Sequence, residues 1–190
     1  MRVVAILLAA GAATRFQADK LHADYRGRPL YRHALDALTA APAVAATLVV
    51  VGPSFPIPPA VERCTFLVNP EPAEGMGSSL RVGVRAAPED AGAYLIALAD
   101  MPALRPELIG DLIAFHAAAG RPITVPVHRG RRGHPVLVSR ELREELLRVQ
   151  GDVGARDILR AHAAGVAEFE TEDPAVLFDV DSPGDLPGAR

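Results

Sequence analysis

Apolar runs alternate with amphipathic segments along the whole chain. Residues 3–9, VVAILLA, are apolar without interruption, which is typical of a parallel strand covered on both faces. The short apolar runs further along predict more strands of the same kind, and two segments near the end predict short closing strands. These predicted strands cover 47–52, 64–69, 93–100, 122–127, 134–139, 166–172 and 175–181.

The segments between these runs have helical spacing. Residues 28–41 place Leu30, Leu35 and Leu38 on one face, with Pro29 in the first turn. Serine hydroxyls at the start of 78–87 are suited to a helix N-cap. The remaining predicted helices cover 105–120, which Gly120 closes, and the segments near 140–149 and 154–164.

This β-α-β alternation, without repeats or linkers, predicts a single α/β domain over residues 1–190. We expect a Rossmann-like, three-layer α/β/α arrangement around a mainly parallel sheet. In such sheets ligands bind at the carboxyl ends of the strands. Residues that follow strands, although distant in sequence, are therefore expected to form one site.

Composition narrows the functional classes. A length of 190 residues, 49% apolar and 23% charged residues are typical of a globular protein. The net charge of −3 gives no reason to expect nucleic-acid binding, and the apolar N-terminal run is too short to cross a membrane. Cys64 is the single cysteine, which excludes an internal disulfide and favours a buried structural thiol. We expect a cytoplasmic enzyme.

The turn after the first strand, within LLAAGAATRFQADK (residues 7–20), has the features of a phosphate-binding loop. Gly11 is the only glycine between Met1 and Arg26, so neither G-x-G-x-x-G nor a P-loop is present. The small residues before and at Gly11 nevertheless allow backbone N–H groups to approach phosphates, and Arg15 and Lys20 add positive charge. The alternative is a tight strand-to-helix turn with solvated basic residues.

Aspartates follow two of the other predicted strands. Asp100 ends LADMP, where the proline prevents the strand from continuing, and Asp179 and Asp181 lie two apart in FDVDSPGDL. Carboxylates are hard ligands for Mg²⁺, which commonly binds one or two of them together with substrate phosphates. The alternative for the second cluster is an Asp-rich turn, which we favour for Asp185.

Seven motifs in order resemble the MobA-like nucleotidyltransferases, and specifically their MocA-type molybdenum cofactor cytidylyltransferase branch. They are LAAGAATRFQADKL (8–21), GRPLYRHAL (27–35), EGMGSSLRVGV (74–84), LADMPAL (98–104), GRRGHPVL (130–137), GDVGAR (151–156) and DVDSPGDL (179–186). The resemblance implies an enzyme that transfers CMP from CTP to the phosphate of molybdopterin, with Mg²⁺, and releases pyrophosphate. It also implies an NTP-binding part over about 1–105 and an acceptor-binding part over about 106–190, with a molybdoenzyme as a possible client.

The resemblance also implies roles for individual residues. Arg15, Lys20 and Asp100 correspond to the catalytic positions, and Asp100 and Asp181 to the metal ligands, with Asp179 as the alternative second ligand. The positions implied for nucleotide binding are Leu8, Ala9, Ala10, Gly11, Arg15, Lys20, Gly75, Gly77, Ser78, Ser79 and Asp100.

The acceptor side is implied by the two later glycine-rich motifs. GRRGHP and GDVGAR place Arg132, His134 and Arg156 among glycines, where they would contact the acceptor phosphate. We expect Arg129 and Arg131, by contrast, to be solvated at a hairpin tip.

Three alternatives share the nucleotide half of this hypothesis. One uses GTP instead of CTP, and one uses a sugar-phosphate or isoprenoid-type acceptor. The third is a non-catalytic factor that binds and inserts the molybdenum cofactor. The presence of Lys20, Asp100 and Asp181 together argues against a non-catalytic protein, because nucleotidyl transfer consists of positioning and charge neutralisation by such groups.

Gly11→Leu tests the phosphate-loop hypothesis. We expect this change to abolish NTP binding, because a leucine side chain fills the space that the phosphates need. Isothermal calorimetry with CTP and GTP measures the effect. Unchanged affinity for both nucleotides would contradict phosphate binding by this loop and favour a purely structural turn.

Overall fold

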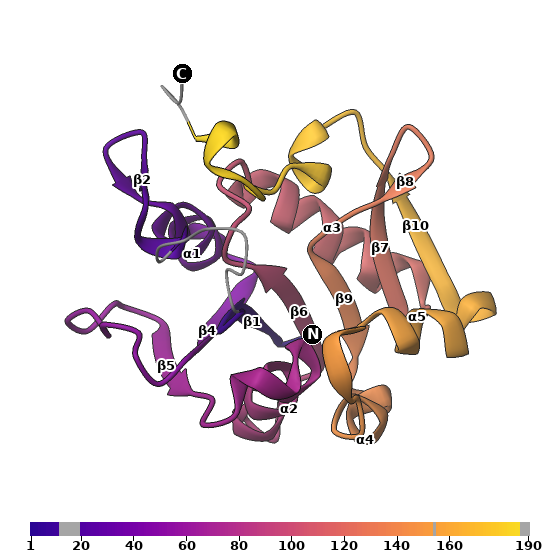
Figure 1. Ribbon diagram of the computed structural model, residues 1–190. Helices are drawn as coiled ribbons and strands as arrows, with labels where there is room; N and C mark the ends of the chain where they lie inside the picture. The colour runs from indigo at the N-terminus through magenta and orange to yellow at the C-terminus, as the bar shows by residue number, and fades with distance from the viewer. Residues whose placement is uncertain (12–19, 154, 187–190) are drawn as a thin grey trace.

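A single twisted sheet forms the centre of the molecule (Figure 1). The computed structural model describes residues 1–11, 20–153 and 155–186. Within these residues the strand order is β10-β7-β9-β6-β1-β4-β5, with β8 paired to β7. The strands are β1 (Val3–Ala9), β4 (Val44–Val51), β5 (Cys64–Val68), β6 (Ala93–Leu98), β7 (Ile123–His128), β8 (Arg131–Arg132), β9 (Val136–Ser139) and β10 (Val166–Glu170), and a separate hairpin joins β2 (Asp24–Tyr25) to β3 (Arg28–Pro29).

The sheet is mainly parallel, as the sequence predicts. β1 pairs in parallel with β4 and β6, β4 with β5, and β7 with β10. β9 runs antiparallel to both of its neighbours, β6 and β7. The segment that precedes β9 therefore lies next to the C-terminal end of β6.

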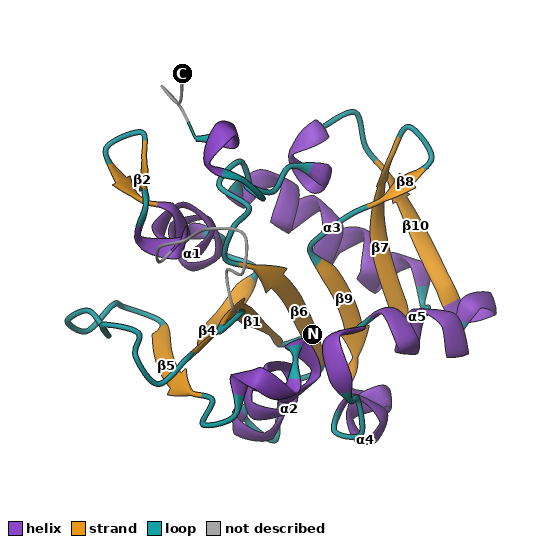
Figure 2. Cartoon of the chain, in the orientation of Figure 1, coloured by secondary structure: helices purple, strands orange, loops and turns teal. Residues whose placement is uncertain are grey.

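Helices cover both faces of the sheet (Figure 2). The helices α1 (Leu30–Ala40) and α3 (Pro106–Ala119) pack on the face that receives Val3, Ala5 and Leu7 of β1. The other face receives Val4, Ile6 and Leu8 and is covered by α2 (Met76–Ala86), α4 (Arg143–Leu146) and α5 (Arg156–Ala161). Because successive side chains of a strand point to opposite faces, one apolar run supplies two cores. The predicted three-layer α/β/α class is confirmed. Among the described residues, no helix has both the length and the apolar character needed to span a bilayer.

Two local predictions are wrong. Residues 175–181 form no strand: Pro174–Leu177 is a 3₁₀ turn, which begins where the Asp173 carboxylate accepts a hydrogen bond from the N–H of Ala175 (3.0 Å). Ser78 is not an N-cap, because α2 already begins at Met76, after Gly75. Helices are present near 140–149 and 154–164, as predicted, but they are short: α4 and α5 are accompanied by 3₁₀ turns at Arg140–Leu142 and Ala163–Gly165.

Gly83 of α2 tests how closely this helix packs on the sheet. A Cβ at Gly83 would lie 2.4 Å from Cγ2 of Ile6, which is fully buried in β1. Gly83→Ala is therefore expected to destabilise the fold by about 1–3 kcal/mol through overpacking. Denaturant unfolding measures the change.

Gly110 of α3 is the matched control. A Cβ there meets nothing within 4 Å. Gly110→Ala is expected to stabilise the protein by about 0.5–1 kcal/mol, because alanine has the higher helix propensity. Equal effects of the two variants would contradict the packing described here.

Candidate active site

Three carboxylates meet just beyond the C-terminal end of β6. Asp100 lies two residues beyond β6, and Asp179 and Asp181 arrive from the C-terminal segment. One oxygen from each carboxylate lies within 4.8 Å of the others. The backbone N–H of Val180 donates to the carbonyl of Asp100 (3.0 Å), which joins the two segments directly. The structure thus brings together the aspartates that the sequence separates by about 80 residues.

Lys20 lies beside Asp100 and Asp181. It occupies the 3₁₀ turn Lys20–His22, and its Nζ lies 2.9 Å from Oδ2 of Asp100 and 3.8 Å from Oδ1 of Asp181. The Lys20 side chain is only 12% exposed. One ammonium against three carboxylates leaves this cluster with an excess of negative charge.

Burial and this excess charge together change the pKa of Asp179. Burial raises the pKa of the Asp179 carboxyl above its ordinary value, and the negative charges of Asp181 and Asp100 raise it further, against a smaller opposing effect of Lys20. Oδ1 of Asp100 is buried and has no hydrogen-bond partner among the residues that the structure describes. Clustered carboxylate oxygens, one of them unsatisfied, fit the ligand preference of a hard divalent cation.

Of the first turn, the structure describes Ala10 and Gly11, which follow β1. Leu8, Ala9 and Ala10 are buried at the end of β1, so their side chains belong to the cores. Gly11 is exposed, and a Cβ there would meet nothing within 4 Å. Arg15, the predicted second basic residue of this loop, lies outside the described residues.

Gly75 and Gly77 make close backbone contacts instead of facing open space. Gly75 has φ +95°, and a Cβ there would lie 2.6 Å from the carbonyl carbon of Gly151. A Cβ at Gly77 would lie 3.0 Å from the Gly151 oxygen. The N–H of Met76 also donates to Oδ1 of Asp152 (3.2 Å). These glycines join the GMGSS motif to the GDVGAR motif.

Ser78 and Ser79 point into the protein and bind Asn69, a residue that the sequence did not single out. Nδ2 of Asn69 donates to the hydroxyl oxygens of Ser78 (2.7 Å) and Ser79 (3.0 Å). Oδ1 of Asn69 accepts from the N–H of Glu71 (3.0 Å). Asn69 follows the edge strand β5 and is 1% exposed. An asparagine before a proline at a strand end, followed by paired hydroxyls, is the signal that could have found this network.

A cleft of about 710 Å³ opens beside the carboxylates. Asp179 and Met101 line it on the cluster side, and apolar residues such as Leu98 and Val136 also contribute. Four arginines line the cleft: Arg131 and Arg132 of β8, and Arg156 and Arg160 of α5. The cleft therefore combines apolar contact surface with groups that bind anions.

The predicted acceptor residues differ in their surroundings. Arg132 forms a two-point ion pair with Glu168 (2.8 and 2.7 Å). Arg156 is exposed and makes no ion pair within the described part of the chain. His134 is half-buried, its Nδ1 is buried without a hydrogen-bond partner among the described residues, and burial lowers the pKa of its imidazole.

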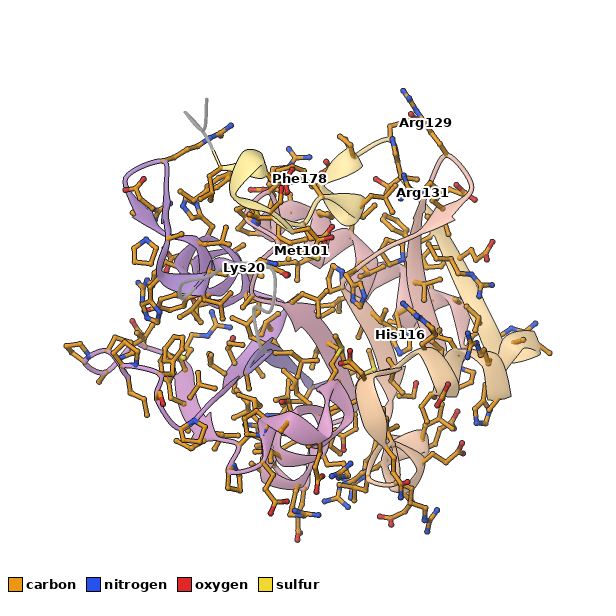
Figure 3. All side chains as sticks on the ribbon, viewed as in Figure 1. Lys20, Met101, His116, Arg129, Arg131 and Phe178 are labelled. Atoms are coloured by element: carbon orange, nitrogen blue, oxygen red, sulfur yellow. The ribbon has the colours of Figure 1, made fainter. Side chains whose placement is uncertain are left out.

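Arg129 and Arg131 are exposed at the hairpin, as expected. Arg131 also lines the cleft, whereas Arg129 projects from the tip (Figure 3). The reason is the reversal at Arg129 and Gly130, both with positive φ, which returns the chain along β7 as β8.

The sequence profile of the MobA-like NTP transferase domain matches residues 5–175, which is most of the chain. This protein belongs to that family. The MobA-like domain thus supplies a nucleotidyltransferase framework for the site described above, while its substrates are a separate question.

The relatives of this MobA-like protein have varied names. A phosphoenolpyruvate guanylyltransferase of Nocardia farcinica is 34% identical over 177 residues, covering 89% of this chain and 76% of the relative. The structure of Rv0371c from Mycobacterium tuberculosis superposes with a TM-score of 0.82 at 23% identity, covering 97% of this chain and 96% of that one. The same mycobacterial protein in complex with manganese gives a TM-score of 0.77 at 22% identity, covering 97% and 96%.

A double-mutant cycle on Asn69 and Ser79 tests the buried network. Asn69→Ala is expected to cost about 1–3 kcal/mol in the free energy of unfolding, because it leaves buried hydroxyls without their donor. Ser79→Ala in the Asn69→Ala background should cost less than in the wild type. Purely additive losses in urea unfolding would contradict a direct hydrogen bond.

Proposed function

We propose that this MobA-like protein transfers a nucleoside monophosphate from an NTP to the phosphate group of a small acceptor, with release of pyrophosphate. The observation that carries the proposal is the cluster of Asp100, Asp179, Asp181 and Lys20 beside an arginine-lined cleft. This arrangement combines a site for the nucleotide phosphates with a site for a second anion.

In the proposed reaction, an oxygen of the acceptor phosphate attacks the α-phosphorus of the NTP. A phosphorus–oxygen bond to the acceptor forms as the bond between the α-phosphorus and the oxygen bridging to the β-phosphate breaks. The electron pair leaves with pyrophosphate. An ionised phosphate needs no general base, so the task of the protein is positioning and charge neutralisation.

The described residues divide these tasks between them. Arg156, which has no ion-pair partner among them, and Arg132 would bind the acceptor phosphate in the cleft. Lys20 would exchange its contact with Asp100 for one with the nucleotide phosphates. Asp100 and Asp181, with Asp179 beside them, would hold Mg²⁺, which neutralises charge on the α-phosphate when bound.

GTP is the first candidate nucleotide. The guanylyltransferase relative is 34% identical over 89% of this chain, and its name supports guanine and, as acceptor, phosphoenolpyruvate. An acceptor with both a phosphate and a carboxylate is also consistent with several arginines in one cleft.

CMP transfer to molybdopterin is the second candidate. The seven motifs in order favour it, and LAAG is similar to the CTP-using branch. The apolar residues that line the cleft would also suit a flat pterin ring. The two candidates share the phosphate chemistry and differ only in the base and the acceptor.

A pyrophosphate-release assay distinguishes these possibilities. GTP, CTP, ATP and UTP are each supplied with Mg²⁺ and with phosphoenolpyruvate, molybdopterin or no acceptor. Release that requires one acceptor and one nucleotide supports transfer and identifies both substrates. Tight molybdopterin binding without any release would favour the cofactor-insertion alternative.

Asp100→Asn tests the chemistry of the cluster. The amide keeps the shape of the carboxylate but loses its charge, so kcat is expected to fall by about 100-fold or more. Steady-state pyrophosphate release at saturating Mg²⁺ measures it. Asp36→Asn is the matched control, because it breaks the ion pairs of Asp36, on α1, with Arg28 of β3 and Arg32 of α1. A rate near wild type for Asp100→Asn would overturn its role.

A further inference from the structure

The C-terminal segment 171–181, here called the strap, delivers Asp179 and Asp181 to the site, and backbone contacts hold it in place. At its start, the N–H of Thr171 donates to the carbonyl of Val127 (2.9 Å). In its middle, the carbonyl of Val176 accepts from the N–H of His134 (2.9 Å). At its end, the N–H of Val180 reaches the carbonyl of Asp100.

The contact in the middle of the strap depends on Gly133. A Cβ at Gly133 would lie 2.1 Å from the oxygen and 2.8 Å from the carbonyl carbon of Val176. Both atoms belong to backbone, and the Val176 side chain is 1% exposed, so the strap cannot yield by turning a side chain. Any residue larger than glycine must push the strap away from the loop before β9.

The strap also has an anchor that does not involve Gly133. Nη2 of Arg105 donates to Oδ2 of Asp173 (2.6 Å). Although burial alone would raise the pKa of the Asp173 carboxyl, Arg105 and the N–H of Ala175 hold it below its ordinary value. Asp173 therefore binds its partners as a carboxylate and joins the strap to the start of α3.

These contacts hold the strap in place against electrostatic repulsion between its two aspartates and Asp100. The carboxylates of Asp179, Asp181 and Asp100 share one small volume, and Asp179 forms no ion pair with any residue in the described part of the chain. Repulsion alone would move Asp179 and Asp181 away from Asp100. Asp179 lies only three residues beyond Val176, so a displacement at Val176 reaches it directly.

We propose that Gly133 is a positioning residue for the metal ligands: its lack of a side chain lets the strap dock at Val176 and thereby sets Asp179 and Asp181 against Asp100. The proposal rests on the metal site of the proposed function. Arg132 and His134, which line the cleft, flank Gly133 in the sequence. The contact between Gly133 and Val176 therefore links the cleft wall to the segment that carries Asp179 and Asp181. Gly133 needs no contact with substrate to act in this way.

The test is direct Mn²⁺ binding to the 190-residue chain, measured by the loss of the free-ion signal in electron paramagnetic resonance. Gly133→Ala is expected to weaken Mn²⁺ binding at least tenfold. Gly83→Ala is the matched control, because it also forces a Cβ into a packed contact, but between α2 and β1. It should lose stability and keep its Mn²⁺ affinity within about twofold.

The outcomes separate this proposal from the proposed function. Wild-type affinity in Gly133→Ala, with normal Mn²⁺ binding by the wild-type protein, would overturn the positioning role alone. Absence of Mn²⁺ binding by the wild-type protein would overturn the metal site, and the positioning role with it. Equal weakening in Gly133→Ala and Gly83→Ala would reduce the effect to lost stability and also overturn the proposal.

A second variant applies if Gly133→Ala does not fold. Arg105→Gln removes the ion pair to Asp173 without adding an atom beside the strap. A several-fold weaker Mn²⁺ affinity would support positioning by the strap, and an unchanged affinity would overturn it.

Discussion

Mutual repulsion among Asp100, Asp179 and Asp181 is the constraint on which the site depends. The carboxylate oxygens lie within 4.8 Å of one another, so their like charges repel, although solvent screens this repulsion at the Asp181 side chain, which is 63% exposed. Lys20 offsets part of this repulsion, and backbone hydrogen bonds oppose the rest. In the proposed function, a bound divalent cation would relieve this repulsion, because carboxylate oxygens are ligands that such cations prefer.

The antiparallel strand β9 determines what lies next to these carboxylates. Its first residue, Val136, pairs with Ile96 near the end of β6, and its last residue, Ser139, pairs with Ala93 at the start. The loop that precedes β9, with Gly133 and His134, therefore lies at the same end of β6 as Asp100. A parallel strand in this position would place that loop at the opposite end of β6, away from Asp100.

Much of this architecture could be predicted from sequence because burial determines it. The apolar run of β1 supplies both cores, and the helical spacing of Leu30, Leu35 and Leu38 matches α1. The strap could not be predicted in this way. AVLFDVD has the composition of a strand, but its backbone bonds go to His134 and Asp100 instead of to a neighbouring strand. Tertiary contacts thus override the local preference.

The sequence by itself determined the α/β class, the positions of most strands and the identity of the residues that carry charge to the site. These follow from hydrophobic spacing and from side-chain chemistry, both of which are local properties. Only the tertiary structure decided that Asp179 and Asp181 reach Asp100 and Lys20, that Ser78 and Ser79 bind Asn69, and that Arg131 lines the cleft. The physical reason is that each of these contacts depends on strand direction and on backbone packing between distant segments, which no short stretch of sequence encodes.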